Sequence, residues 1–414
     1  MSFPHYPKYK DSGVEWLGAV PEHWETCLLK RAFRSVDYGI SDSLDSEGAV
    51  AILRMGNIAN GKVVTDDLKY TDSVDPALIL RHGDLLYNRT NSLDLIGKVG
   101  MFVGNGESPV SFASYLVRLR TVDKSLPDYF AYLLNTDGIL SLARANAFVA
   151  IGQCNLNPTR YGQITVAIPP LTEQTRIAEF LDRETGKIDE LVAEQRRLME
   201  LLNEQIISLV LSSFHAPATT ELRLSEASTI ISRPVIQKAD ENYTRIGLFN
   251  RGRGLFHKDA SEMDDMGESD FFWVEEEDLI ISGQFAWEGA VALADKEDTG
   301  CVVSHRYPVI RGKSGIALTE YLLGLFCTKH GDFLLNENSR GAAGRNRPLN
   351  ISSLMKEKIP VPSMGVQEAV ARAVHARKVL FKEIAKAIAL LQERRTALIS
   401  AAVTGQIDVR NVNP

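Results

Sequence analysis

Two segments of the chain share one pattern and lie 193 residues apart. Residues 168–174 read IPPLTEQ and precede a long charged stretch with periodic apolar residues, and residues 361–367, VPSMGVQ, precede another. A repeat of this length exceeds the roughly 20–50 residues of a solenoid unit. It therefore predicts two copies of one module, each a globular body followed by a long helix.

The bodies that precede the two helices share further landmarks. Residues 25–170 show short β-branched runs between Gly, Asn and Asp turns, which is typical of strand-rich structure. Residues 222–362 repeat that plan with different loops, as expected of two recognition bodies with different targets. The first body is expected to form strands at 49–53, 62–64, 84–87 and 115–119 and a helix at 128–147. The segments that begin at Asp278, Tyr307 and Glu320 correspond to those at 84, 115 and 128, and residues 349–350 correspond to residues 156–157.

The two long stretches have the 4-3 apolar spacing of a coiled coil. The first seam runs through residues 177, 181, 184, 188, 191, 195, 198, 202, 205 and 209, and the second lies 193 residues later. About forty residues at about 1.5 Å each would make a rod of about 60 Å. We expect the two helices to pack antiparallel about a pseudo-twofold axis, with Glu184 and Arg395 within ion-pair distance; that both are merely solvated charges stays open.

Composition limits the class of protein. The chain has 414 residues, enough for two or three domains, and no apolar run approaches the roughly 20 residues that span a bilayer. The N-terminus lacks the apolar core of a signal peptide, so we expect a cytoplasmic protein without a membrane partner. The four cysteines form no CxxC pair, which favours reduced thiols over a zinc site or disulfides.

The net charge of −7 argues against a nucleic-acid partner only if charge is spread evenly. Residues 259–278 hold ten acidic side chains and no basic one, and we expect them to face solvent. Residues 340–347 hold three arginines and no acid, and Arg251 and Arg253 form a similar pair. Local basic patches therefore keep DNA binding open.

Catalytic motifs are absent. The sequence lacks a G-x-x-x-x-G-K-[ST] phosphate loop, a G-x-G-x-x-G turn after a strand, G-x-S-x-G and H-E-x-x-H. Its only Pro-Pro, residues 169–170, precedes a helix and does not sit in the Asn/Asp-Pro-Pro-aromatic loop of an amino-methyltransferase. These absences favour a protein that binds over one that catalyses.

Three segments resemble a known family. The N-terminal string YKDSGVEWLGAVPEHWE (residues 9–25) is similar to the opening of Type I restriction-modification specificity (S) subunits. Residues 170–181, PLTEQTRIAEFL, resemble their central conserved region, and residues 397–408, ALISAAVTGQID, their ending. The match covers essentially the whole chain, in the order that the family shows, and its motifs are structural.

The resemblance implies an α+β fold of two similar strand-rich target-recognition domains joined by two long antiparallel coiled-coil helices. Each domain would read one half of a split, asymmetric site in double-stranded DNA, and the helices would set the spacer. The chain would bind two methyltransferase (modification) subunits, with restriction subunits joining them. S-adenosylmethionine and ATP would belong to those partners, so no cofactor or metal is expected here. The expected domains are residues 1–170, 171–214, 215–362 and 363–414.

Base reading needs Arg, Lys, Asn or Gln side chains in a groove, and phosphate contacts need Lys and Arg. The segment Asn60-Gly61 is also a common hairpin turn. The candidate DNA-binding residues are Arg54, Asn57, Asn60, Lys62, Asn88, Arg89 and Asn91 in the first body, and Arg251, Arg253, Lys258, Arg340, Arg345, Asn346 and Arg347 in the second.

Two other functions remain open from the sequence. One is a coiled-coil scaffold with two protein-binding heads, and the other is a self-contained DNA methyltransferase or nuclease. Gel shifts with pooled duplexes would separate the scaffold from a DNA reader. Binding of the methyl donor, or cleavage of DNA, by the purified chain would favour the enzyme.

Overall fold

The computed structural model describes residues 3–59, 61–104, 108–150, 152–236, 241–262, 269–341, 347–410 and 412. The chain forms two compact units. Unit 1 comprises Met1–Ala193 and Ile388–Pro414, and unit 2 comprises Glu194–Ala387. Each of the two long helices, α4 (Leu171–Ser213) and α10 (Met364–Val403), contributes residues to both units.

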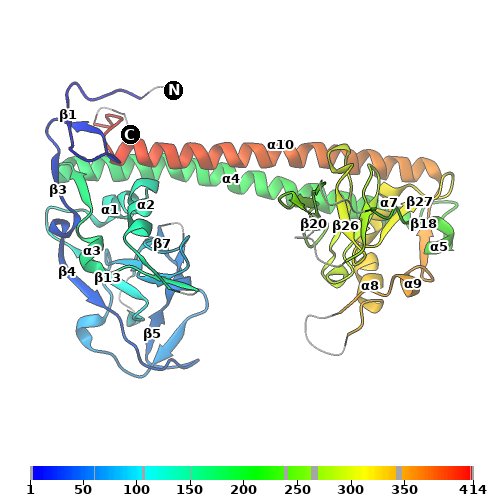
Figure 1. Ribbon diagram of the computed structural model, residues 1–414, viewed down its shortest axis with the longest axis horizontal. Helices are drawn as coiled ribbons and strands as arrows, with labels where there is room; N and C mark the ends of the chain where they lie inside the picture. Colours follow the sequence, from blue (N-terminus) through cyan, green and yellow to red (C-terminus); the bar gives the residue numbers. More distant parts are fainter. Residues whose placement is uncertain are drawn as a thin grey trace. The chain divides into compact units, whose positions relative to one another are not determined.

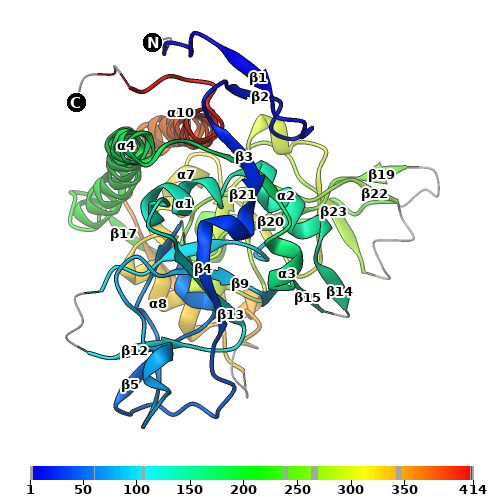
Figure 2. The same ribbon diagram turned by 90° about the vertical axis from the view of Figure 1, so that its left-hand side faces the viewer.

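Unit 1 is built on a six-stranded sheet of order β4-β13-β9-β11-β7-β6. Its central strands are antiparallel, with Tyr87 of β9 opposite both Val117 of β13 and Val99 of β11. Smaller sheets and three helices surround it (Figures 1 and 2). The elements are β1 (Tyr9–Asp11), β2 (Ala19–Pro21), β3 (Glu25–Leu28), β4 (Phe33–Tyr38), β5 (Val50–Leu53), β6 (Ile58–Ala59), β7 (Lys62–Val63), β8 (Lys69–Thr71), β9 (Leu85–Asn88), β10 (Thr90–Asn91), β11 (Val99–Met101), β12 (Val110–Phe112), β13 (Leu116–Thr121), α1 (Pro127–Leu133), α2 (Asp137–Ala145), β14 (Phe148–Ala150), β15 (Gln153–Asn155), α3 (Pro158–Tyr161) and β16 (Thr165–Ile168).

Unit 2 repeats the central frame as a four-stranded sheet of order β18-β27-β24-β25. These strands correspond in sequence order and pairing to β4, β13, β9 and β11, and β17 pairs with β28 as β3 pairs with β16. The internal repeat is therefore confirmed. The elements are β17 (Thr220–Arg223), α5 (Leu224–Ala227), β18 (Ser228–Ile231), β19 (Asn242–Tyr243), β20 (Ile246–Leu248), β21 (Leu255–His257), β22 (Ser261–Glu262), β23 (Phe271–Trp273), β24 (Leu279–Ile281), β25 (Val291–Leu293), β26 (Val302–Ser304), β27 (Val309–Gly312), α7 (Thr319–Phe326), α8 (Lys329–Glu337), α9 (Ile351–Leu354) and β28 (Lys358–Val361).

The repeated glutamine at the start of each long helix has a structural role. Gln174 is fully buried; its Oε1 accepts from the Leu126 amide at 2.8 Å, and its Nε2 donates to the Lys124 and Pro169 carbonyls at 3.0 and 2.9 Å. Buried backbone polar groups need such partners. The glutamine thus ties the helix to the loop that precedes α1. Gln367 makes the equivalent bonds in unit 2 with the Leu318 amide (2.9 Å) and the Ile316 and Pro362 carbonyls (2.9 and 2.8 Å).

The long helices share the hydrophobic core of the body in each unit. In unit 1, Ile177 and Leu181 of α4 pack in one cluster with Leu398 and Ala402 of α10. In unit 2 the later part of α4 meets the earlier part of α10, through Val210 and Val370. The helices therefore run antiparallel within each unit, as expected (Figure 1).

The predicted seam holds for α10 and slips along α4. Every predicted position of α10 from Val370 to Ala402 is buried or half-buried. In α4 the prediction is correct at 177, 181 and 188, but Leu191, Leu198 and Leu209 are exposed, while Val192, Ile206 and Val210 are buried. The buried stripe of α4 thus advances by more than 3.5 residues per turn, as in a helix that packs against a globular body as well as another helix.

The predicted Glu184–Arg395 ion pair is wrong. The Nε of Arg395 lies 2.9 Å from the Oδ1 of Asp189, and Glu184 pairs instead with Arg183 and Lys187 on its own helix. Our prediction assumed one unbroken 4-3 seam along both helices. The slip of the α4 stripe moves another acidic residue, Asp189, next to Arg395.

Two properties expected from composition can be compared with the structure. All four cysteines are free, and Cys27, Cys154 and Cys301 are buried. Within the described ranges, none of the helices combines the length and the apolar character needed to span a bilayer.

Candidate nucleic-acid interface

In unit 1, β4 and β9 end and β13 begins at the same end of the sheet, which positions the predicted residues after β9. Tyr38, the last residue of β4, pairs with Val117 of β13, and the adjacent Leu116 pairs with Asn88, the last residue of β9. The amide of Arg89 donates to the Tyr115 carbonyl at 3.0 Å. The side chains of Tyr38, Asn88 and Arg89 are therefore brought to one end of the sheet.

Arg89 is held against an exposed aromatic ring. Its guanidinium carbon lies 5.0 Å from the centroid of the Tyr38 ring, and its Nη1 donates to the Ser114 carbonyl at 3.3 Å. Its Nε is buried and has no partner among the described residues. Stacking on a ring is a favourable cation–π contact that leaves the edge of the guanidinium available. Arg89 is thus preorganised to offer a planar set of donors.

The three described asparagines among the candidates have different surroundings. Asn57 is buried, and its amide nitrogen donates to the carbonyls of Val64 and Asp66, so this side chain closes its own loop. Asn88 is 1% exposed, and its Oδ1 has no partner within the described part of the chain. Asn91 is half-buried, and its Oδ1 accepts from the Ser92 amide. The position of Asn57 favours a structural role.

The remaining candidates of unit 1 lie beside the hairpin formed by β6 and β7. Ala59 pairs with Lys62, so the predicted turn falls between them; Asn60 itself lies outside the described residues. Lys62 is exposed. Arg54 forms an ion pair with Asp67, with its Nη2 2.9 Å from the Oδ2. Lys62 is therefore the freer cation of the two.

In unit 2, Arg251 and Arg253 lie in the loop that joins β20 to β21. The Arg251 amide donates to the Glu288 carbonyl, and the neighbouring Gly252 amide donates to the Gly289 carbonyl. The guanidinium of Arg253 lies 5.6 Å from the ring centroid of Phe249. Lys258, just after β21, is exposed. The loop is thus fixed by its backbone while its two arginine side chains are exposed.

Trp287, which the sequence analysis did not select, lies near several of the candidate arginines of unit 2. The guanidinium of Arg347 lies 5.2 Å from the ring centroid of Trp287. Trp287, Arg251 and Arg253 line one cavity of about 1070 Å³. Arg340 lies elsewhere, bound to Glu337 at 2.9 Å. Arg345 and Asn346 fall outside the described residues.

The two units use the same connection of the repeated frame. The connection from β9 to β11 carries Arg89, and the corresponding connection from β24 to β25 carries Trp287. The sequence did not predict that the rings of Tyr38, Phe249 and Trp287 stack on arginines. In two of these pairs, Arg89 with Tyr38 and Arg347 with Trp287, the residues lie more than about fifty positions apart in sequence. Of these three rings, Phe249 is the one that a search for aromatic residues close in sequence to the candidate arginines would have found, because it lies near Arg253.

The expectation that residues 259–278 face solvent is wrong for its last member. Asp278 is fully buried and lies 2.6 Å from the Nε of Arg311 and 2.8 Å from the Nη1 of Arg233. Its counterpart, Asp84, is also buried and lies 2.7 Å from the Nε of Arg120. This aspartate precedes the central strand of each repeat, and a buried charge needs such partners. Residues 263–268 lie outside the described ranges.

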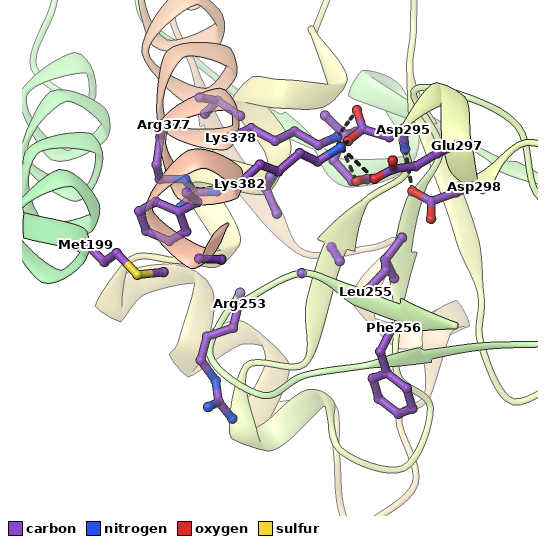
Figure 3. A pocket seen from close by; sticks show the side chains of 18 of the residues that line it. Met199, Arg253, Leu255, Phe256, Asp295, Glu297, Asp298, Arg377, Lys378 and Lys382 are labelled. Atoms are coloured by element: carbon purple, nitrogen blue, oxygen red, sulfur yellow. Dashed lines mark hydrogen bonds and ion pairs between the residues drawn. The ribbon is translucent and has the colours of Figure 1, made fainter. Parts of the chain in front are cut away.

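In unit 2, lysines of α10 form ion pairs with acidic residues of the globular body, close to the loop that carries Arg253. Figure 3 shows Lys378 and Lys382 pointing from the helix toward Asp295 and Glu297, beside a cavity of about 510 Å³ that Arg253 also lines. Lys378 lies 2.5 Å from Asp295, and Lys382 lies 2.8 Å from Asp295 and 2.6 Å from Glu297. Partial burial alone would raise the pKa of Asp295, but the hydrogen bonds and charges of the two lysines outweigh it and lower the pKa.

The two ion pairs of Asp295, with Lys378 and Lys382, should contribute to stability only while Asp295 is ionised. Because the folded-state pKa of Asp295 is lowered, its contribution is present above the unfolded value of about 4 and is lost as pH falls through the folded value. Asp295→Asn should therefore lower the melting temperature of unit 2 at pH 6, and the difference from wild type should shrink toward pH 3. Glu368→Gln, an exposed acid on the helix that carries the two lysines, is the control. A difference that does not change with pH would contradict the assignment.

Comparisons with known proteins agree with this geometry. Residues 32–198 match the family model described as the Type I restriction modification DNA specificity domain. The chain is 22% identical over 422 residues to the type I restriction enzyme MjaX specificity subunit of Methanocaldococcus jannaschii, covering 95% of this chain and 96% of that protein. It is 21% identical to the StySPI specificity subunit of Salmonella potsdam, covering 94% and 90%.

A solved structure has the same fold over nearly the whole chain. It belongs to a study of complex assembly and conformational transition in the type I R-M system, and it has a TM-score of 0.61 at 15% identity. The likeness covers 93% of this chain and 98% of that one. The matched domain and the relatives confirm the resemblance noted in the sequence: residues 32–198 match the Type I restriction modification DNA specificity domain, and nearly the whole chain is similar to Type I specificity subunits.

Proposed function

We propose that this chain is the DNA-recognition subunit of a Type I restriction-modification complex, and that unit 1 and unit 2 each read one half of a split, asymmetric site. The observation that carries the proposal is a shared frame in which equivalent connections each contribute one member of a different arginine–aromatic stack, Arg89 on Tyr38 in unit 1 and Trp287 under Arg347 in unit 2. A shared central frame explains why both units bind the same kind of ligand. Different side chains on it explain why the two half-sites differ.

The stacked arginines suit base reading. A guanidinium offers two parallel donors to the O6 and N7 of guanine in the major groove, which is a common specific contact. An aromatic ring stacked on the guanidinium already restricts the arginine side chain, so the side chain loses less conformational entropy when it binds a base. Arg89, Arg253 and Arg347 are therefore the best candidates for base contacts, while exposed Lys62 and Lys258 suit phosphate groups.

The long helices are proposed to set the number of unread base pairs. Residues 1–170 and 215–362 would be the target-recognition domains, and 171–214 and 363–414 the helical segments between and after them. Both helices contribute to the cores of both units. A change in helix length should therefore change the spacer.

Catalysis is proposed to lie on other chains, in the absence of any catalytic motif in this sequence. Two modification subunits would supply S-adenosylmethionine-dependent methylation, and restriction subunits would supply ATP-driven cleavage. Exposed apolar residues of the helices, such as Val379 and Leu390, offer surfaces on which modification subunits could dock.

Single arginine substitutions test the proposal. With the modification subunits bound and at fixed salt, Arg89→Ala and Arg347→Ala should each weaken binding to the cognate duplex by about 10- to 100-fold, the worth of one bidentate base contact. Arg31→Ala, an exposed arginine near the other end of the unit 1 sheet, should leave affinity unchanged. Unaltered affinity in both test variants would show that the stacks are not part of the interface.

A further inference from the structure

Unit 1 carries a β-hairpin that the common frame does not require. Strands β14 and β15 are antiparallel, with Ala150 opposite Gln153, and β15 also pairs with β10, where Cys154 lies opposite Asn91. The hairpin is thus hydrogen-bonded to the segment that follows Arg89. Within the described ranges of unit 2, no three-stranded sheet of this kind is present.

Two large apolar residues on this hairpin are mostly exposed. Phe148 is 58% exposed and Val149 is 72% exposed. Successive side chains of a strand point to opposite faces, so both faces of β14 are open. Since β14 is the edge strand of its sheet, it also presents unpaired backbone groups. An exposed edge strand that carries apolar side chains is a surface to which a partner can bind.

The chemistry around these residues points to a polyanion. The guanidinium of Arg160, on α3, lies 4.2 Å from the ring centroid of Phe148, and Figure 2 shows α3 beside the hairpin. Gln153 is exposed at the turn. No acidic residue occurs between Asp137 and Glu173, a stretch that includes the whole hairpin and α3. A basic, acid-free surface next to Arg89 complements DNA.

We infer that the β14–β15 hairpin enters the major groove of the half-site read by unit 1 and places Phe148 and Val149, on opposite faces of β14, each against the C5-methyl group of a thymine. The major groove admits a two-stranded β-ribbon, and thymine presents there a methyl group that apolar side chains contact. In this arrangement the guanidinium of Arg160, which stacks on Phe148, can donate a hydrogen bond to a phosphate or to a base edge. The inference rests on the proposed function and adds a specificity-determining contact to it.

Uracil substitution tests this contact directly. The duplex carries the methylated site of the host, and each thymine of the unit 1 half is replaced in turn by uracil, which lacks only the methyl group. For the complete complex with modification subunits, one replacement should lower affinity about three- to fivefold, the worth of one buried methyl group. The double variant Phe148→Ala, Val149→Ala should bind the thymine duplex more weakly and should no longer distinguish uracil from thymine at that position.

Controls separate this contact from other causes. Val103→Ala, also an exposed apolar residue of unit 1, should retain the uracil penalty. Phe148→Leu should keep much of it, and melting curves would verify folding of each variant. A uracil penalty that is equal in wild type and the double variant, a unit 1 half-site without thymine on either strand, or loss of modification-subunit binding in place of DNA binding would each overturn the inference. If Arg89→Ala still weakens binding in that case, the proposed function stands and only the hairpin contact fails.

Discussion

Inserting one heptad into each long helix is expected to move the second half-site about three base pairs farther away and to abolish methylation of the native site. Seven helical residues add about 10 Å, and a base pair occupies about 3.4 Å of duplex. A heptad rotates the helix face by only about 20°, so each unit keeps its own packing. Suitable positions are after Ala193 and after Ala387, where the chain passes from one unit to the other.

Sequencing of methylated sites in the host measures the outcome. The variant should methylate the same two half-sequences with a longer gap between them. Insertion of two residues in each helix is the control, because it turns the apolar face by about 200° and should destroy pairing of the helices. A folded heptad variant that still methylates the original spacing would show that the helices do not set it.

Gln367→Ala is expected to destabilise unit 2 by about 2–4 kcal/mol, because it removes three buried hydrogen bonds and leaves their backbone partners unsatisfied. The partners are the Leu318 amide and the Ile316 and Pro362 carbonyls. Gln174→Ala should have a similar effect in unit 1 through the Leu126 amide. Urea unfolding of each variant gives the free energy, and hydrogen exchange of the Leu318 and Leu126 amides identifies the unit affected.

The neighbouring residue provides the comparison. Glu368 follows Gln367 on the same helical turn and is exposed, so Glu368→Ala should change the free energy of unfolding by less than about 0.5 kcal/mol. Equal effects of the two substitutions would mean that helix propensity, and not the buried hydrogen bonds, determines the result.

The frame was predictable because its landmarks are local and occur twice. Asp84 and Asp278 precede the central strands, Gln174 and Gln367 begin the long helices, and each pair makes equivalent contacts. Because each of these buried polar residues makes the same contacts in both copies, it occurs at the same sequence position in both copies. Antiparallel pairing of the helices was expected because the chain contains two apolar seams, related by a pseudo-twofold axis.

The details of the helices and of the site depend on contacts that sequence spacing does not contain. The α4 stripe slips because α4 packs on a body as well as on α10, so Arg395 meets Asp189 and not Glu184. Asn57 was a plausible base reader by residue type, yet its amide closes a loop. Arg89 and Arg347 were chosen for charge, but the rings that orient them come from Tyr38 and Trp287, far away in the chain.

The central claim is that two related bodies read two halves of one DNA site independently. Its most direct test is a map of methylated adenines in the host carrying wild type, Arg89→Ala or Arg347→Ala. The account predicts a bipartite site in which Arg89→Ala relaxes the sequence of one half only and Arg347→Ala relaxes the other half only. A continuous site, or two variants that relax the same half, would contradict it.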